Sequence, residues 1–189
     1  MVGAVLALSA CSTSPYNVSA MARPGADFST FKTYGWVTPL GTDKEGYSTI
    51  ITSYFKSSVQ SQMAARGYVY SATNPDLLVN FATNVETRTE VYSSPSPSIS
   101  MGYYGYRGGY GYGIGMPMYS NDVSTSHYKV GTVNVDILDA ARKEIIWEGV
   151  LEGKLTKKSM DNPGAAIEQV IAQIFAKYPI PSNVPAAVK

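Results

Sequence analysis

Hydrophobic and polar positions alternate with a period of two in two long segments of this chain. In residues 77–92 the apolar and threonine positions fall on one face, namely Val79, Phe81, Thr83, Val85, Thr87, Thr89 and Val91. Residues 128–138 alternate in the same way, and residues 144–155 follow after a short polar hairpin loop. A period of two is typical of strands that bury one face, so these segments predict three antiparallel strands.

A helical period replaces the alternation in two other segments. In residues 47–66 apolar side chains recur at spacings of three and four, namely Ile51, Tyr54, Phe55, Val59 and Met63. A second helix is expected to begin after Asn162, the predicted N-cap, with Pro163 at its first position. Its apolar stripe consists of Ile167, Val170, Ile171, Ile174 and Phe175. Two shorter runs, residues 30–37 and 68–70, are rich in strand-forming residues.

The order of these elements predicts an α+β fold, an antiparallel sheet of about five strands with two helices packed on one face. The other face of the sheet is expected to be open to solvent. The folded domain is predicted to span residues 26–178, preceded by a tether over residues 12–25. Residues 179–189 are expected to form a loose tail.

A glycine- and tyrosine-rich insert, residues 93–122, separates the two long alternating segments. Glycine makes a regular element unfavourable there, so we expect a long loop. Two interpretations are open: a flexible hairpin connection of low complexity, or an adhesive surface that contacts a partner. In the second case tyrosines would supply large contact area, and the expected contact residues are Tyr103, Tyr104, Tyr106, Arg107, Tyr110 and Tyr112. Peptidoglycan sugars, lipid head groups or another protein would be the partner.

The first eleven residues combine an apolar run with the only cysteine in the sequence, Cys11. The run from Val2 to Ala10 would span roughly 14 Å as a helix, too little to cross a bilayer but typical of a signal peptide. Its end, Leu8-Ser9-Ala10-Cys11, resembles the bacterial lipobox. The competing interpretation is a small buried cysteine in an ordinary first strand.

The lipobox resemblance implies that residues 1–11 are a lipoprotein signal peptide ending at Cys11. Cys11 would then carry acyl chains such as palmitate and anchor the protein in a membrane. Ser12 rather than aspartate follows the cysteine, which implies the outer membrane of a Gram-negative bacterium, on its periplasmic face. No Lys or Arg precedes Arg23, although signal peptides ordinarily begin with basic residues; a weak signal or a start upstream of Met1 would account for this.

Composition and side-chain chemistry argue against an enzyme. Fifteen basic and 14 acidic residues give a net charge of +1, which provides no attraction to nucleic acid. With one histidine, His127, and one cysteine, the chain lacks the ligands of a usual zinc site. Glu86 and Glu90 are interpreted as a solvated strand face balanced by Arg88, and Asp136 and Asp139 as turn and edge residues. We therefore predict no catalytic residues, no metal and no cofactor.

The chain resembles the DUF4136 family of bacterial lipoproteins, whose function is uncharacterised. The residues that carry the resemblance are the lipobox, Ala26-Asp27-Phe28-Ser29, Phe31-Lys32-Thr33-Tyr34-Gly35-Trp36, Arg66-Gly67-Tyr68, Asn74-Pro75-Asp76-Leu77-Leu78-Val79 and Ile146-Trp147-Glu148-Gly149.

The favoured function is a lipid-anchored, non-catalytic binding or scaffolding domain of the cell envelope, with the membrane and a protein or cell-wall component as partners. A structural or adhesive envelope component that acts through the insert is the alternative. A carboxylate-based hydrolase is the least favoured.

Overall fold

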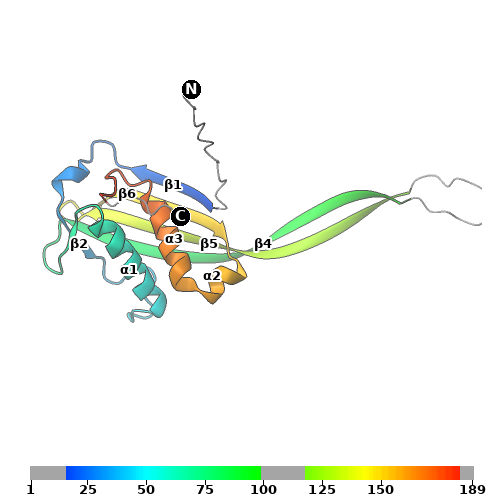
Figure 1. The fold of residues 1–189 in the computed structure, drawn as a ribbon, viewed down its shortest axis with the longest axis horizontal. Helices are drawn as coiled ribbons and strands as arrows, with labels where there is room; N and C mark the ends of the chain where they lie inside the picture. The colour runs from blue at the N-terminus through cyan, green and yellow to red at the C-terminus, as the bar shows by residue number, and fades with distance from the viewer. Residues whose placement is uncertain (1–15, 99–117, 184–189) are drawn as a thin grey trace, which may run out of the picture. The chain divides into compact units, whose positions relative to one another are not determined.

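A computed structural model describes residues 16–98 and 118–183 of the chain, and it contains a six-stranded sheet with helices (Figure 1). Two units are distinguished, one formed by residues up to Glu86 and from Lys129, the other by residues 87–128. The elements are β1 (Tyr16–Ala22), the 3-10 helix η1 (Phe28–Thr30), β2 (Thr33–Trp36), α1 (Ile50–Ala64), β3 (Val69–Tyr70), β4 (Leu77–Ser98), β5 (Met118–Asp139), β6 (Glu144–Lys154), α2 (Lys157–Asp161) and α3 (Pro163–Phe175).

The α+β class is confirmed, but the sheet is mixed rather than antiparallel. Its strand order is β1-β6-β5-β4-β2-β3, and β2 runs parallel to both of its neighbours, β3 and β4. The chain leaves β2, passes through α1 and returns in β3, and a helical crossover of this kind is what parallel strands require. The predicted five strands and two helices therefore become six strands and three α-helices in the described residues.

Strand β1 lies within residues 12–25, where an irregular tether was expected. It pairs antiparallel with β6 over its whole length, from Tyr16 opposite Gly153 to Ala22 opposite Trp147. Val18 and Ala20 pack against the hydrophobic core from this strand. The prediction of a tether was wrong for residues 16–22, because pairing with β6, which lies far along the chain, stabilises this short strand more than local propensity does.

The long strands β4 and β5 also reach into the expected insert, at residues 93–98 and 118–122. The predicted inward face of β4 is buried at Val79 and Phe81, whereas Val85 is 56% exposed. Valine and threonine favour strands without being buried, so the alternation identified the strand correctly but overstated the length of its buried face.

The alternation of buried and exposed residues is broken at the start of β6. Ile145 is 47% exposed, whereas its neighbours Ile146 and Trp147 are both buried. The register between β5 and β6 shifts between Ile137 and Leu138. A local irregularity of this kind breaks the period of two, so two consecutive residues enter the core.

The two predicted helices cover one face of the sheet, and their ends are formed by local signals (Figure 1). Asn162 caps α3 by accepting a hydrogen bond from the amide of Ala165, with Pro163 at the first position, as expected. In α1 the buried residues are Thr52, Phe55, Val59 and Met63. Ile51 and Tyr54, assigned to the same stripe, are each 38% exposed.

The segment after α3 is anchored to α1, although residues 179–189 were expected to be loose. The carbonyl oxygen of Ile180 accepts a hydrogen bond from Nε of Arg66, and the amide of Asn183 donates to the carbonyl of Ala65. Residues 179–183 therefore belong to the folded domain, and residues 184–189 lie outside the described part of the chain.

Candidate functional site

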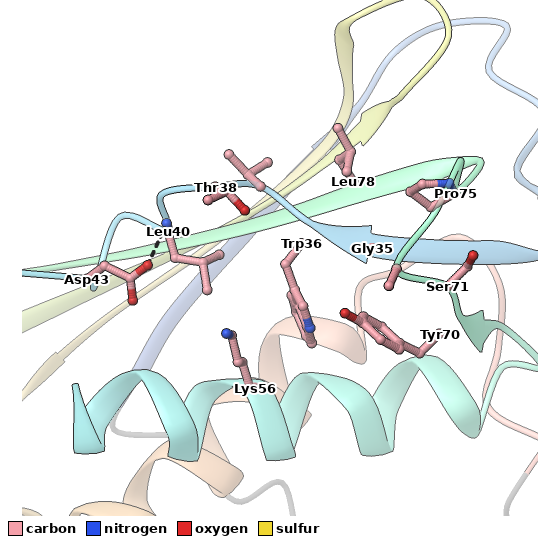
Figure 2. Close-up of a pocket in the computed structure, with 12 residues that line it drawn as sticks. Gly35, Trp36, Thr38, Leu40, Asp43, Lys56, Tyr70, Ser71, Pro75 and Leu78 are labelled. Atoms are coloured by element: carbon pink, nitrogen blue, oxygen red, sulfur yellow. Dashed lines mark hydrogen bonds between the residues drawn. The ribbon is translucent and has the colours of Figure 1, made fainter. Parts of the chain in front are cut away.

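A groove of about 310 Å³ lies where β2, β3 and α1 meet (Figure 2). Strand β3 ends at Tyr70, so Trp36 at the end of β2 has a paired strand, β4, on one side only. The turn after β3 closes the groove at one end, and it packs against β2 at Gly35. A Cβ at that glycine would lie 2.8 Å from Cγ of Pro75, so the close approach requires glycine.

Two aromatic rings form the wall of the groove. Trp36 and Tyr70 lie 6.2 Å apart between ring centroids, inclined by 35°. Behind them Tyr34 contacts both rings edge-on, at 5.5 Å from Trp36 and 5.7 Å from Tyr70. Burial, and secondarily the neighbouring Tyr70, raises the pKa of Tyr34 to about 12, so this phenol stays neutral. The wall is therefore held rigidly by a buried aromatic ring.

Charged groups in the groove are few, and one of them is available to a ligand. Both carboxylate oxygens of Asp43 accept hydrogen bonds, Oδ2 from the amide of Leu40 at 3.0 Å and Oδ1 from the hydroxyl of Thr52 at 3.1 Å. Lys56 forms no hydrogen bond or ion pair with any residue that the structure describes. Its amine points from α1 toward the strand side of the groove (Figure 2). The groove thus offers a positive charge beside an aromatic wall.

A second polar cluster lies at the C-terminal ends of α1 and α3 and is buried. The guanidinium of Arg66 donates to the carbonyls of Gln62, Phe175 and Ile180, and lies 5.2 Å from the centre of the Phe175 ring. Burial lowers the pKa of Arg66 and raises that of Tyr178. Carbonyls at helix C-termini are good acceptors for a cation. Because Arg66 donates hydrogen bonds to carbonyls at the ends of both helices, this cluster has a structural role.

The lipidation site and the contact residues expected in the insert lie outside the described residues. These are Cys11, Tyr103, Tyr104, Tyr106, Arg107, Tyr110 and Tyr112, and they remain predictions.

The residues dismissed as catalytic are found in ordinary environments. His127 is exposed, and its Nδ1 lies 3.0 Å from the hydroxyl of Thr89. Asp139 accepts hydrogen bonds from the amides of Ala141 and Arg142 in the β5–β6 turn. Asp136, also on β5, accepts a hydrogen bond from the side-chain amide of Asn80 on β4 at 3.1 Å.

Neither a metal-binding cluster nor a membrane-spanning helix is found in residues 16–98 and 118–183. No three His, Cys, Asp or Glu side chains of this part come together in a way that could hold a metal ion. None of its helices has both the length and the hydropathy of a bilayer-spanning segment.

Sequence reasoning did not identify the groove residues Trp36, Lys56 and Tyr70 as a site. One signal was present in the helix: Lys56 is the only charged residue of α1. It lies four residues after the buried Thr52 and three before the buried Val59, so it belongs to the edge of the buried stripe rather than to the solvent face. A lysine at such a position points toward the face of the sheet that the helix covers.

Comparison with known proteins agrees with this description of the fold. A family model described as a domain of unknown function, DUF4136, matches residues 18–180. The chain belongs to the DUF4136 family. No curated protein sequence matches it.

The solved structures that resemble this DUF4136 chain share little sequence with it. A DUF4136 family protein from Bacteroides thetaiotaomicron has a TM-score of 0.53 at 16% identity, over 91% of this chain and 100% of the other. A PDZ domain protein from Parabacteroides distasonis has a TM-score of 0.49 at 14% identity, over 89% of this chain. This chain spans only 36% of the length of that protein. The PelC dodecamer from Paraburkholderia phytofirmans has a TM-score of 0.47 at 12% identity, over 85% of this chain and 96% of the other.

Proposed function

We propose that this DUF4136 protein is a lipid-anchored, non-catalytic binding domain of the bacterial envelope that holds an anionic sugar in the groove beside Trp36. The observation that carries the proposal is the combination of the Trp36–Tyr70 wall with the ammonium of Lys56, which has no partner among the residues that the structure describes. A flat apolar wall with few polar groups is typical of small-molecule sites. The wall suits the apolar face of a pyranose ring, and the ammonium suits a carboxylate.

The same groove lacks the groups that hydrolysis would need. Glycosidases ordinarily use two carboxyl groups on opposite sides of the scissile bond. Asp43 is the only carboxylate that lines this groove, and both of its oxygens accept hydrogen bonds from Leu40 and Thr52. These contacts support binding without turnover.

A matched pair of sugars tests the groove. N-acetylmuramic acid differs from N-acetylglucosamine by a lactyl ether that carries a carboxylate, so only the first can pair with Lys56. Trp147 is buried, and binding can therefore be followed by the change in Trp36 fluorescence. We expect tighter binding of the acidic sugar, by about tenfold for one charge-assisted hydrogen bond.

The variant Lys56→Gln should bind both sugars equally, because the amide cannot pair with the carboxylate as a cation. Lys177→Gln, at the far end of α3, is the matched control and should retain the preference. Equal binding of the two sugars by the unaltered protein, or loss of the preference in both variants, would contradict the proposed site.

The membrane anchor is a separate part of the proposal and has its own test. We propose that Cys11 is acylated and holds the domain on the periplasmic face of the outer membrane. The variant Cys11→Ala should appear in the soluble periplasmic fraction, and Ser12→Asp should remain membrane-bound but shift to the inner membrane. If Cys11→Ala fractionates with the outer membrane as fully as the unaltered chain, the lipid is not the anchor.

A further inference from the structure

One end of the sheet combines the start of the domain with a concentration of lysines. Strand β1 begins at Tyr16 directly opposite Gly153, one residue before β6 ends at Lys154. The chain that precedes β1 therefore enters the domain beside the end of β6. If Cys11 is acylated, the five residue steps to Tyr16 span at most about 18 Å. This part of the domain would then remain close to the bilayer surface.

Four lysines surround this point. Lys154 ends β6, and Lys157 and Lys158 follow in α2, which lies beside the end of β6 in Figure 1. Lys129 is brought to the same end because its carbonyl accepts a hydrogen bond from the amide of Leu155 at 2.8 Å. All four lysines are exposed. We call Lys129, Lys154, Lys157 and Lys158 the lysine-rich end.

Acidic residues are fewer around the same point. Asp161, at the end of α2, and Glu86, on β4 beside the Lys129 end of β5, are exposed, and Glu152 on β6 is half-buried. The lysine-rich end therefore keeps a net positive charge, which attracts an anionic surface within a Debye length.

Large apolar side chains are exposed at the same end of the domain. Met160 in α2 is 54% exposed. Tyr54 of α1 packs against Gly164 in the first turn of α3 and is 38% exposed, and Ile50, one turn earlier, is 74% exposed. Because Tyr54 meets the start of α3, the start of α1 lies at the same end of the domain as α2.

We propose that the lysine-rich end, with Met160, Tyr54 and Ile50, docks on an anionic lipid surface. Lysines near such a surface are attracted by its negative potential, and adjacent apolar side chains bury into the boundary between head groups and acyl chains. The occupant follows from charge complementarity and from the short chain between Cys11 and β1. Docking would fix the orientation of the domain, which a lipid on a short tether alone leaves free. The inference uses the proposed anchor but not the groove.

The test removes the lipid so that only the protein surface is measured. The chain from Ser12 onward, which has neither the acylated cysteine nor the apolar run of residues 2–10, is sedimented with vesicles of phosphatidylglycerol and phosphatidylcholine, and with vesicles of phosphatidylcholine alone. We expect binding to the anionic vesicles that weakens with added salt, and much weaker binding to the neutral ones. Adding Lys129→Gln, Lys157→Gln and Lys158→Gln should lower vesicle affinity on the order of 100-fold.

A matched set of three lysines at the opposite end provides the control. Lys32 lies at the start of β2, Lys143 in the β5–β6 turn, and Lys177 after α3. Their change to Gln removes the same charge and should leave vesicle affinity within a few-fold. Met160→Ser should weaken binding to anionic vesicles several-fold while leaving its salt dependence intact.

Three outcomes of the vesicle experiment would overturn the proposal. They are an absence of binding to anionic vesicles, equal binding to both vesicle types, and an equal loss in the two triple variants. Self-association that is abolished by the first triple variant would also overturn it, by identifying a second copy of the chain as the occupant. None of these results affects the sugar titration or the Cys11 fractionation, so this inference and the proposed function can fail separately.

Discussion

Arg66 should be the most important single polar side chain for the stability of this domain. Its guanidinium donates four hydrogen bonds, to the backbone carbonyls of Gln62, Phe175 and Ile180 and to the side-chain oxygen of Gln62, and it has no carboxylate partner among the described residues. It thereby joins the end of α1, the end of α3 and the segment that follows. The variant Arg66→Met keeps the aliphatic stem against the Phe175 ring but removes every donor.

The expected loss in the free energy of unfolding is the sum of contributions from the individual acceptors and from the aromatic contacts. The carbonyl of Phe175 keeps a hydrogen bond from the amide of Tyr178 at 3.1 Å, and the amide oxygen of the Gln62 side chain can turn toward water. The carbonyls of Gln62 and Ile180 lose the donor that Arg66 supplies. A buried acceptor without a partner costs about 1–3 kcal/mol, and these two are half-buried, so about 1 kcal/mol each is reasonable. Loss of the cation–π contacts adds about 1 kcal/mol, for a total near 3 kcal/mol.

Guanidinium-induced unfolding followed by circular dichroism measures this free energy of unfolding directly. A loss of about 3 kcal/mol in a domain of this size should lower Tm by about 6–12 °C. The loss of stability for Arg66→Lys should lie between zero and that of Arg66→Met, since an ammonium reaches fewer of the carbonyls. Arg142→Met is the matched control, because the Arg142 side chain is 72% exposed and meets only Asp139 at 3.7 Å. It should change stability by less than about 0.5 kcal/mol.

The reasoning is refuted if Arg66→Met and Arg142→Met differ by less than about 1 kcal/mol, the lower bound for even one buried acceptor. That result would mean that water reaches the carbonyls of Gln62 and Ile180 in the folded state. The segment after α3 would then be held by the packing of Ile180 rather than by hydrogen bonds.

Three further predictions concern other parts of the domain. The pKa of Tyr34 is raised to about 12 from an ordinary value of 10, so its neutral form stabilises the fold fully below pH 10. That contribution to the free energy of unfolding is lost as pH rises toward 12. Tyr34→Phe should flatten this alkaline loss of stability, as measured by urea unfolding between pH 10 and 12. Asp76→Ala should destabilise by about 1–2 kcal/mol, since Asp76 accepts hydrogen bonds from the amides of Lys32 and Thr33. The same bonds lower the pKa of Asp76 below 3.8, so its contribution should be lost as pH falls through that lowered pKa, and Asp76→Ala should lack this acid step. Gly149→Ala should lower the free energy of unfolding by about 1–3 kcal/mol or more in thermal unfolding, because a Cβ would overlap the Trp147 ring and a methyl of Ile174. A variant as stable as the unaltered protein would show that the core adjusts freely.

The parts of the fold that sequence predicted well are those fixed by neighbouring residues. Asn162 and Pro163 begin α3 because an N-cap oxygen and a proline without N–H suit the first turn of any helix. Gly67 is a signal of the same local kind, since it follows the end of α1 with a φ of +85°, which is easily reached only by glycine. Such signals act over three or four residues, so they can be identified without knowing the rest of the fold.

Strand pairing depends on residues far apart in the chain, and here the sequence was a weaker guide. Nothing within Thr33–Trp36 distinguishes a strand with parallel neighbours from one with antiparallel neighbours. Likewise the place of β1 in the sheet follows from its pairing with β6, which lies far along the chain. Period-two patterns identify strands, but they do not name the partner or its direction.

The misjudged sheet direction and the missed groove have a single physical origin. Because β2 is parallel to β3 and β4, the chain must cross over the sheet through α1, and this crossover brings Lys56 to the strand side. Because β3 contains only two residues, it ends before Trp36 and leaves the strand edge beside that residue unpaired. Antiparallel pairing of β2 with its neighbours would have needed neither the crossover through α1 nor the short strand β3. The groove therefore could be recognised only once the parallel pairing was known, and it is a product of that topology rather than of any local motif.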